Sequence, residues 1–145
     1  ISGATFKVCP NSTEQAKAMG CRYDILSNHW VPGECYDEAA IEDYKSDGSW
    51  FGYSDREWTE RLSIDEMGEG PIYYSNMRDH IVHCAVLWRK QYRALYEQRK
   101  NLDSIIVDTH HTDHCSDFLI RMSNKFHDHR LDPIVVEVGY AGCYM

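Results

Sequence analysis

Two copies of one five-residue pattern, His-x-x-His-Cys, constrain this chain more than any other feature of its sequence. The copies occupy residues 80–84 and 111–115. Side chains three residues apart lie on one face of an α-helix, with Cβ atoms roughly 5–6 Å apart, so each copy places two imidazoles side by side. We expect two antiparallel helices that face each other and present both pairs to a shared metal site. The predicted ligands are His80, His83, His111 and His114.

Both motifs lie in segments whose hydrophobic pattern has the period of a helix. Helices are expected over residues 77–98 and 109–125. Shorter helices are expected at residues 12–19, begun by the N-cap Ser12, and at residues 37–45. The side chains expected to point inward at the latter segment are Tyr36, Ala39, Ala40 and Tyr44.

Strands are expected to be few and short. Residues 72–74 and the β-branched segment 134–138 are predicted strands, residues 31–33 a turn, and residues 53–71 an irregular surface excursion. Residues 102–107 are mainly apolar, and their periodicity does not separate helix from strand. The predicted fold class is therefore mainly α with a few short strands, in a small domain stapled by disulfides.

Length and charge narrow the function classes. A chain of 145 residues with 43% hydrophobic residues can bury a core, and residues 1–145 are treated as one domain. The net charge of −8 argues against a nucleic-acid partner or an anionic membrane surface, because both need a basic face. No apolar run approaches the ~20 residues that a membrane-spanning helix needs.

The cysteines and a glycosylation sequon favour an oxidising compartment. The six cysteines are an even number, and Asn11 begins an Asn-Ser-Thr sequon. A disulfide between Cys9 and Cys21 would staple the short helix between them. The predicted location is the lumen of the secretory pathway or the cell exterior.

Each motif ends in a cysteine for which two roles are open. A disulfide between Cys84 and Cys115 would tie the two helices together beside the metal. Alternatively, both bind as thiolates and complete a two-histidine, two-cysteine set of the zinc type. The carboxylates of Asp79 and Asp113 are candidate acceptors that orient an imidazole. The histidines outside the paired spacing are expected to be ordinary solvated residues: His29, His110, His127 and His129.

An all-imidazole set favours a reactive metal over a structural one. Imidazole suits zinc, copper, iron and nickel, and Cu²⁺ binds most tightly among the divalent ions. Structural zinc sites are usually closed and rich in sulfur, whereas a catalytic site keeps open coordination positions. The sequence has neither a phosphate-binding loop nor a Ser/His/Asp nucleophile motif.

These motifs resemble the UstYa-like family of fungal proteins, named for oxidases that cyclise the ustiloxin peptide. The family is marked by two His-x-x-His-Cys motifs, which here are residues 80–84 and 111–115. The resemblance extends to further short segments, which are residues 9–13, 18–21, 30–32, 35–37, 88–91, 102–104 and 110–112. Residues 126–145 do not align with the family's pattern. A disulfide between Cys35 and Cys143 is expected, but the resemblance does not indicate this pairing.

The resemblance implies a membrane anchor upstream of this chain and a lumenal catalytic domain of fungal secondary metabolism. It implies one or two copper ions, with O₂ or a peroxide as co-substrate, and the four motif histidines as ligands. The implied chemistry is oxidative cyclisation, dehydrogenation, hydroxylation or halogenation of a peptide or other secondary metabolite.

Three functions follow from the motifs and the resemblance together. The first is a copper-dependent oxidase that activates C–H bonds. The alternative is a non-catalytic metal-binding subunit of a homo- or hetero-oligomeric oxidase. A third, a zinc-binding structural module, would need free thiols at Cys84 and Cys115.

Overall fold

The computed structural model describes residues 3–99, 101–123 and 125, and in this part of the chain helices predominate. This confirms the predicted mainly α class. The elements in chain order are α1 (Thr13–Ala18), β1 (Cys21–Asp24), β2 (His29–Pro32), the 3-10 helix η1 (Gly33–Cys35), α2 (Glu38–Lys45), α3 (Ile64–Glu69), α4 (Met77–Tyr96), α5 (Ser104–Val107) and α6 (Thr109–Ser123). The strand predicted at residues 134–138 lies outside the described residues.

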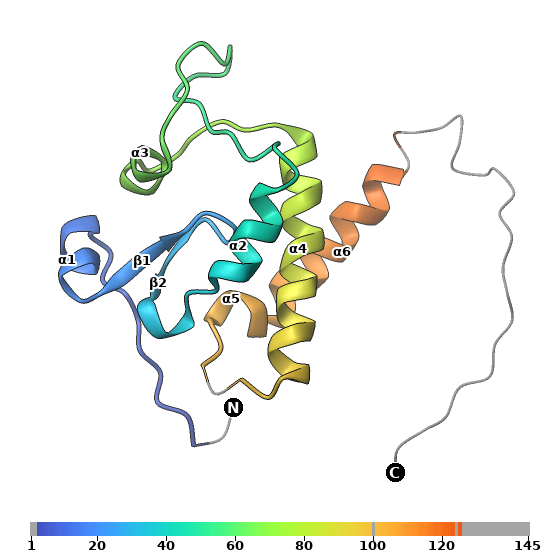
Figure 1. Cartoon of the computed structure of the whole chain (residues 1–145). Helices are drawn as coiled ribbons and strands as arrows, with labels where there is room; N and C mark the ends of the chain where they lie inside the picture. The colour runs from blue at the N-terminus through green and yellow to red at the C-terminus, as the bar shows by residue number, and fades with distance from the viewer. Residues whose placement is uncertain (1–2, 100, 124, 126–145) are drawn as a thin grey trace, which may run out of the picture.

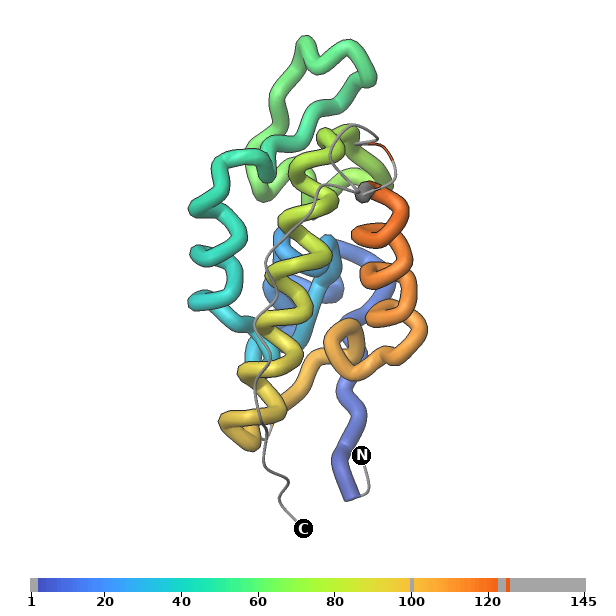
Figure 2. The backbone as a smooth tube through the Cα atoms, turned by 90° about the vertical axis from the view of Figure 1, so that its right-hand side faces the viewer, coloured from blue at the N-terminus to red at the C-terminus, as the bar shows by residue number. Residues whose placement is uncertain are grey.

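Helix α4 is the longest element and the axis around which the others pack. Figure 2 shows α2 along one side of α4 and α6 along the other, with the β1–β2 hairpin behind. The main core lies between α4, α2 and the hairpin turn, where Val86, Ile41 and Leu26 are buried together. A second, smaller cluster joins α4 to α6 through Cys84, Cys115, Phe118 and Met122.

The hairpin was not predicted from the sequence. Strands β1 and β2 pair antiparallel, with Cys21 opposite Pro32 and Asp24 opposite His29. The turn predicted at residues 31–33 is wrong in part, because Val31 and Pro32 belong to β2. A two-stranded ribbon has only edge strands, which tolerate a proline that donates no hydrogen bond.

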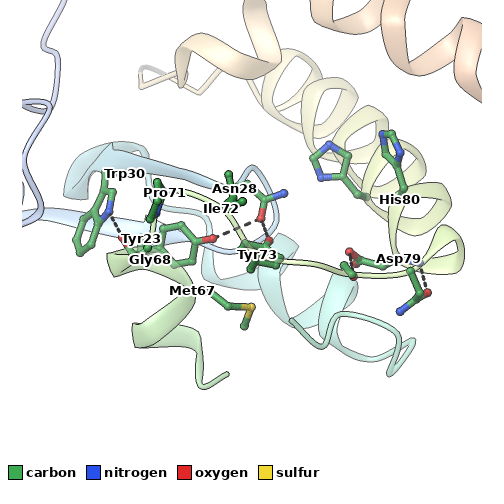
Figure 3. A pocket seen from close by; sticks show the side chains of 14 residues that line it. Tyr23, Asn28, Trp30, Met67, Gly68, Pro71, Ile72, Tyr73, Asp79 and His80 are labelled. Atoms are coloured by element: carbon green, nitrogen blue, oxygen red, sulfur yellow. Dashed lines mark hydrogen bonds between the residues drawn. The ribbon is translucent and has the colours of Figure 1, made fainter. Parts of the chain in front are cut away.

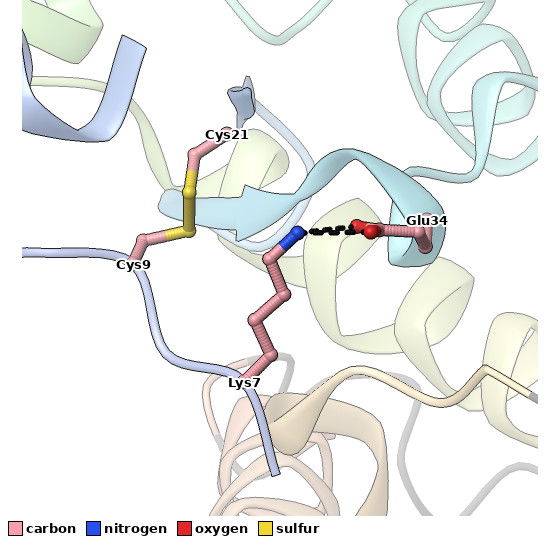
Figure 4. The surroundings of a disulfide bond; sticks show 4 residues. All are labelled: Lys7, Cys9, Cys21 and Glu34. Atoms are coloured by element: carbon pink, nitrogen blue, oxygen red, sulfur yellow. Dashed lines mark hydrogen bonds and ion pairs between the residues drawn. A yellow bond between two sulfur atoms is a disulfide. The ribbon is translucent and has the colours of Figure 1, made fainter. Parts of the chain in front are cut away.

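The amino-terminal segment is attached to the hairpin covalently. Cys9 and Cys21 form the predicted disulfide, and Ser12 caps α1 between them. Lys7 adds an exposed ion pair to Glu34, with 2.8 Å between Nζ and Oε1 (Figure 4). Cys35 has no disulfide partner among the described residues, and Cys143, its expected partner, lies outside them.

Residues 53–71 and 72–74 differ from their predictions. The first segment contains α3, whose N-cap Ser63 forms a capping box with Glu66. The second is not a strand: Tyr74 pairs with Tyr53 only through an isolated bridge. No longer partner strand is present in the described chain, so this pairing stops after one residue pair.

Helices are present within residues 102–107 and within residues 37–45, the latter as predicted. Residues 102–107, left open between helix and strand, contain the short helix α5, whose N-cap Asp103 accepts hydrogen bonds from Ile105 and Ile106. On α2, Ala40 and Tyr44 are buried as predicted, but Ala39 is exposed. Within the described residues, no helix combines the length and apolar character that crossing a bilayer requires.

A buried lysine fixes the hairpin and α5 to the central helix. Lys90 of α4 is 2% exposed, and its Nζ lies 2.9 Å from Asp24 Oδ2 and 2.8 Å from Asp103 Oδ2. Burial lowers the pKa of Lys90, but the two carboxylates outweigh this and hold it above its ordinary value. Asp24 also accepts hydrogen bonds from the backbone N–H groups of Leu26 and Ser27. Its carboxylate therefore joins the hairpin turn to Lys90 of α4.

Candidate metal centre

The four predicted ligands lie at the amino-terminal turns of α4 and α6. Asn76 caps α4 by accepting a hydrogen bond from the Asp79 backbone N–H, so His80 and His83 sit in the first turns of the helix. The other pair lies early in α6, which runs antiparallel to α4 (Figures 1 and 2). The two helices bury their facing residues in the cluster around Cys84 and Cys115.

The four imidazoles form a closed quadrilateral. Within α4 the centroids of His80 and His83 are 5.8 Å apart, and within α6 those of His111 and His114 are 6.5 Å apart. Across the helices, His80 lies 6.0 Å from His114 and His83 lies 5.9 Å from His111. The rings of both pairs therefore lie side by side, whereas their sharing of a metal stays a prediction.

His83 is the most firmly held member of the set. Its Nδ1 lies 2.6 Å from the carbonyl oxygen of Leu26, which makes Nδ1 the donor and leaves Nε2 free. Burial lowers the pKa of His83 to about 4. The ring is therefore neutral at ordinary pH, which is the form that binds a metal.

His80 and His111 share this preference for the neutral form. Burial lowers the pKa of both, and the neighbouring His114 lowers both further. His80 also stacks on Phe118 of α6, with 3.9 Å between the ring centroids. His114 is exposed and completes the quadrilateral at its outer edge.

The motif cysteines are free thiols in the structure, so the first of their two open roles, a Cys84–Cys115 disulfide, is not formed. Burial raises the pKa of the Cys84 thiol, and its hydrogen bond with Cys115 raises it further. Cys115 Sγ lies 3.9 Å from His111 Nε2. The candidate ligand atoms of His83, His111 and Cys115 all lie within 4.8 Å of one another, so thiolate ligation stays open.

Neither predicted carboxylate acts as an acceptor for a motif imidazole. Asp79 is buried and instead accepts hydrogen bonds from the hydroxyl groups of Tyr44 and Ser75, the latter at 2.6 Å. Asp113 is exposed, and no described side chain donates a hydrogen bond to its carboxylate. The acceptor that orients an imidazole is a backbone carbonyl, that of Leu26, which sequence reasoning missed because it missed the hairpin.

A fifth histidine lies near the centre. His29 begins β2, and its Nδ1 lies 2.5 Å from the carbonyl oxygen of Ser27. Among the smaller influences on the pKa values of His83 and His111 is the charge of His29, which lowers both. His110 is exposed, as expected, while His127 and His129 lie outside the described residues.

A groove of about 540 Å³ opens beside the α4 pair. His80 and His83 line one end of it, and Asn28, Trp30 and Tyr73 line the rest (Figure 3). The sequence offered no signal for this groove, because its far wall comes from the hairpin and from residues 67–73. A ligand in the groove would lie directly beside two of the four imidazoles.

The residue types suit a transition metal, and the ligand atoms of His83, His111 and Cys115 already lie within 4.8 Å of one another. Four imidazoles around one tetrahedral ion, with metal–nitrogen distances of about 2.0–2.1 Å, place ring centroids roughly 5 Å apart. The observed 5.8–6.5 Å is wider. The four imidazoles would therefore have to close by about 1 Å to bind one tetrahedral ion.

Comparison with known proteins finds two curated relatives, the phomopsin biosynthesis cluster proteins B and B' of Diaporthe leptostromiformis. Each is 25% identical to this chain over 124 residues, an alignment that covers 78% of the chain. The aligned region is only 36% of each relative, so the chain spans about a third of their length. No family model and no solved structure matches.

Proposed function

We propose that this protein is a copper-dependent oxidase of natural-product biosynthesis that acts on a peptide or another secondary metabolite. One observation carries the proposal: four imidazoles from two helices lie side by side, and two of them, His80 and His83, line a groove large enough for an organic substrate. A buried structural ion would not need such access. The relatives' names support a role in natural-product biosynthesis, and the resemblance to the UstYa-like family supports oxidative copper chemistry.

The chain's own groups would hold the metal and orient the substrate. His80, His83, His111 and His114 supply imidazole nitrogens, and the Leu26 carbonyl fixes which nitrogen of His83 is available. Bound copper would supply one-electron chemistry and the activation of O₂. Burial keeps three of the rings neutral, so metal binding does not first have to remove protons from them near pH 7.

The overall reaction balances as a dehydrogenation. A substrate that gives up two hydrogen atoms, whether by ring closure or by forming a double bond, delivers two electrons and two protons. O₂ accepts them and leaves as hydrogen peroxide. Hydroxylation would insert one oxygen atom and require an external reductant to convert the other to water.

The cellular setting is part of the proposal. The Cys9–Cys21 disulfide fits an oxidising compartment, and we place the domain in the lumen of the secretory pathway. Asn11 is exposed, as its glycosylation would require. An anchor upstream of this chain would attach the domain to the membrane.

A second function, as a metal-binding subunit of a larger oxidase, is favoured by one surface. On α4, Trp88 is 43%, Tyr92 67% and Leu95 60% exposed, and they line a shallow, mainly apolar hollow on the side of the helix away from the groove. Exposed aromatic side chains are enriched at protein–protein interfaces. A family member or a second copy of the chain would be the partner.

The test is turnover by the purified protein alone. Copper-loaded protein is incubated with O₂ and a panel of short peptides, and products are sought by mass spectrometry as loss of two hydrogen atoms or gain of one oxygen. The oxidase proposal expects product with copper and none with zinc. Product that appears only after a second protein is added would favour the subunit function.

A further inference from the structure

We infer that the Asn28 carboxamide is a substrate-positioning group that donates a hydrogen bond to a carbonyl oxygen of a neutral, amide-bearing substrate. This rests on the proposed function for its role in catalysis, but the binding it describes is independent of metal. Asn28 lies at the end of the hairpin turn and lines the groove that reaches His80 and His83.

Two tyrosines fix the orientation of this carboxamide. The hydroxyl groups of Tyr23 and Tyr73 both donate to Asn28 Oδ1, the former at 3.4 Å. Burial raises the pKa of both tyrosines, so both hydroxyls keep their protons and remain donors. The oxygen is thereby occupied, and the amide nitrogen is directed away from the tyrosines.

The amide nitrogen of Asn28 is left without a partner among the described residues, because every hydrogen bond of this side chain uses its oxygen. Figure 3 shows the nitrogen turned away from the two tyrosine hydroxyls, on the side of the histidines. Two N–H donors held in a groove match a carbonyl acceptor, which is the acceptor of an amide.

The backbone at Asn28 is also specialised. Its φ of 57° lies in the left-handed region, which is unfavourable for most non-glycine residues and best tolerated by asparagine. Glycine would form the same turn without that cost. Strain that persists in a groove wall is typical of a functional position.

The rest of the groove indicates a neutral ligand. Its lining includes no lysine or arginine among the described residues, and the one carboxylate, Asp79, is already hydrogen-bonded to Tyr44 and Ser75. Trp30 donates its indole N–H to the Gly68 carbonyl at 2.9 Å, so that its ring forms part of the wall. An uncharged amide with an apolar or aromatic side chain suits this surface.

The test uses metal-free protein and a small probe, N-acetylphenylalaninamide, with N-acetylphenylalanine as its anionic counterpart. Binding is followed by NMR through the backbone and indole N–H signals of Trp30, which lines the groove and is present in every variant. The amide should shift these signals and bind more tightly than the acid. Asn28→Gly, which keeps the turn, should weaken binding of the amide roughly three- to tenfold, the equivalent of one hydrogen bond.

A matched control exists at the far end of α4. Gln98 has a φ of 51° and is exposed, so Gln98→Gly makes the same backbone change away from the groove and should leave binding unchanged. Equal affinity of wild type and Asn28→Gly would overturn the inference, as would equal binding of acid and amide or no binding of the amide. Because the assay contains no copper, failure of the oxidase proposal would leave this result intact.

Discussion

The two histidine pairs share one motif, yet the protein holds them differently. The α4 pair rests on the main core: His83 is hydrogen-bonded to Leu26, and Lys90, two turns further along, positions the turn that carries Leu26. The α6 pair rests on the smaller cluster around Phe118, and His114 is exposed. The two identical motifs thus predict which histidines lie together. The surroundings of each pair decide which pair is held in place before a metal binds, and this is the α4 pair.

The largest expected effect comes from removing the support of the α4 half. Lys90→Met leaves the carboxylates of Asp24 and Asp103 buried without their cation, which should cost about 3–5 kcal/mol of unfolding free energy. Urea denaturation measures this. The control is Arg89→Met, whose exposed ion pair with Asp43 should be worth less than about 1 kcal/mol. Equal losses of unfolding free energy in both variants would show that the buried Lys90 gives the α4 histidine pair no more support than a surface ion pair does.

The next effect concerns the attachment of α6. Phe118→Ala removes the ring that stacks on His80 and fills the α4–α6 cluster, and should lower the free energy of unfolding by about 3 kcal/mol. Hydrogen exchange should show lost protection in α6 while α4 stays protected. Arg121→Ala, an exposed change on the same helix, should alter neither. Loss of protection spread evenly over both helices would show that they form one cooperative unit.

Metal affinity should follow preorganisation. His83→Ala removes a ligand that Leu26 already orients, whereas His114→Ala removes an exposed one. We expect the dissociation constant for copper to rise at least about tenfold more in the former variant. Competition titration with a chelator measures both constants. A larger loss for His114→Ala would invert the assignment of the preorganised half.

The smallest effect is a pH dependence of the metal-free protein. Burial lowers the pKa of His83 to about 4 in the folded state, against an ordinary value near 6.5, so the unfolded chain binds more protons between these values. Stability is complete above pH 6.5 and falls as the pH drops toward 4. Between pH 7 and 5 the loss should be about 1 kcal/mol once partial exposure is allowed for. His83→Asn should flatten the dependence of unfolding free energy on pH. An unchanged dependence in this variant would show that it arises from groups other than His83.

The sequence predicted the parts of the site that depend on local periodicity. Helical spacing placed His80 beside His83 and His111 beside His114, and the N-cap Ser12 follows from local chemistry. These features need only neighbours within one turn of helix, so one sequence is enough to find them.

The features that escaped prediction depend on contacts between distant segments. The hairpin and the groove beside Asn28 are of this kind, and the hydrogen bond from His83 to Leu26 spans 57 positions. Asp79 was assigned to an imidazole because it adjoins His80, but the fold uses it to bind Tyr44, 35 residues away. Adjacency in sequence does not reveal which way a side chain turns.

We propose that imidazoles from both helices bind copper at one centre. The most direct test is a Cu²⁺ EPR spectrum of the purified protein beside His83→Ala and His110→Ala, the latter an exposed histidine adjacent to the second motif. The claim predicts nitrogen hyperfine structure in the wild type, its loss or marked change in His83→Ala, and an unchanged spectrum in His110→Ala. Identical spectra from all three proteins, or no bound copper in the wild type, would contradict it.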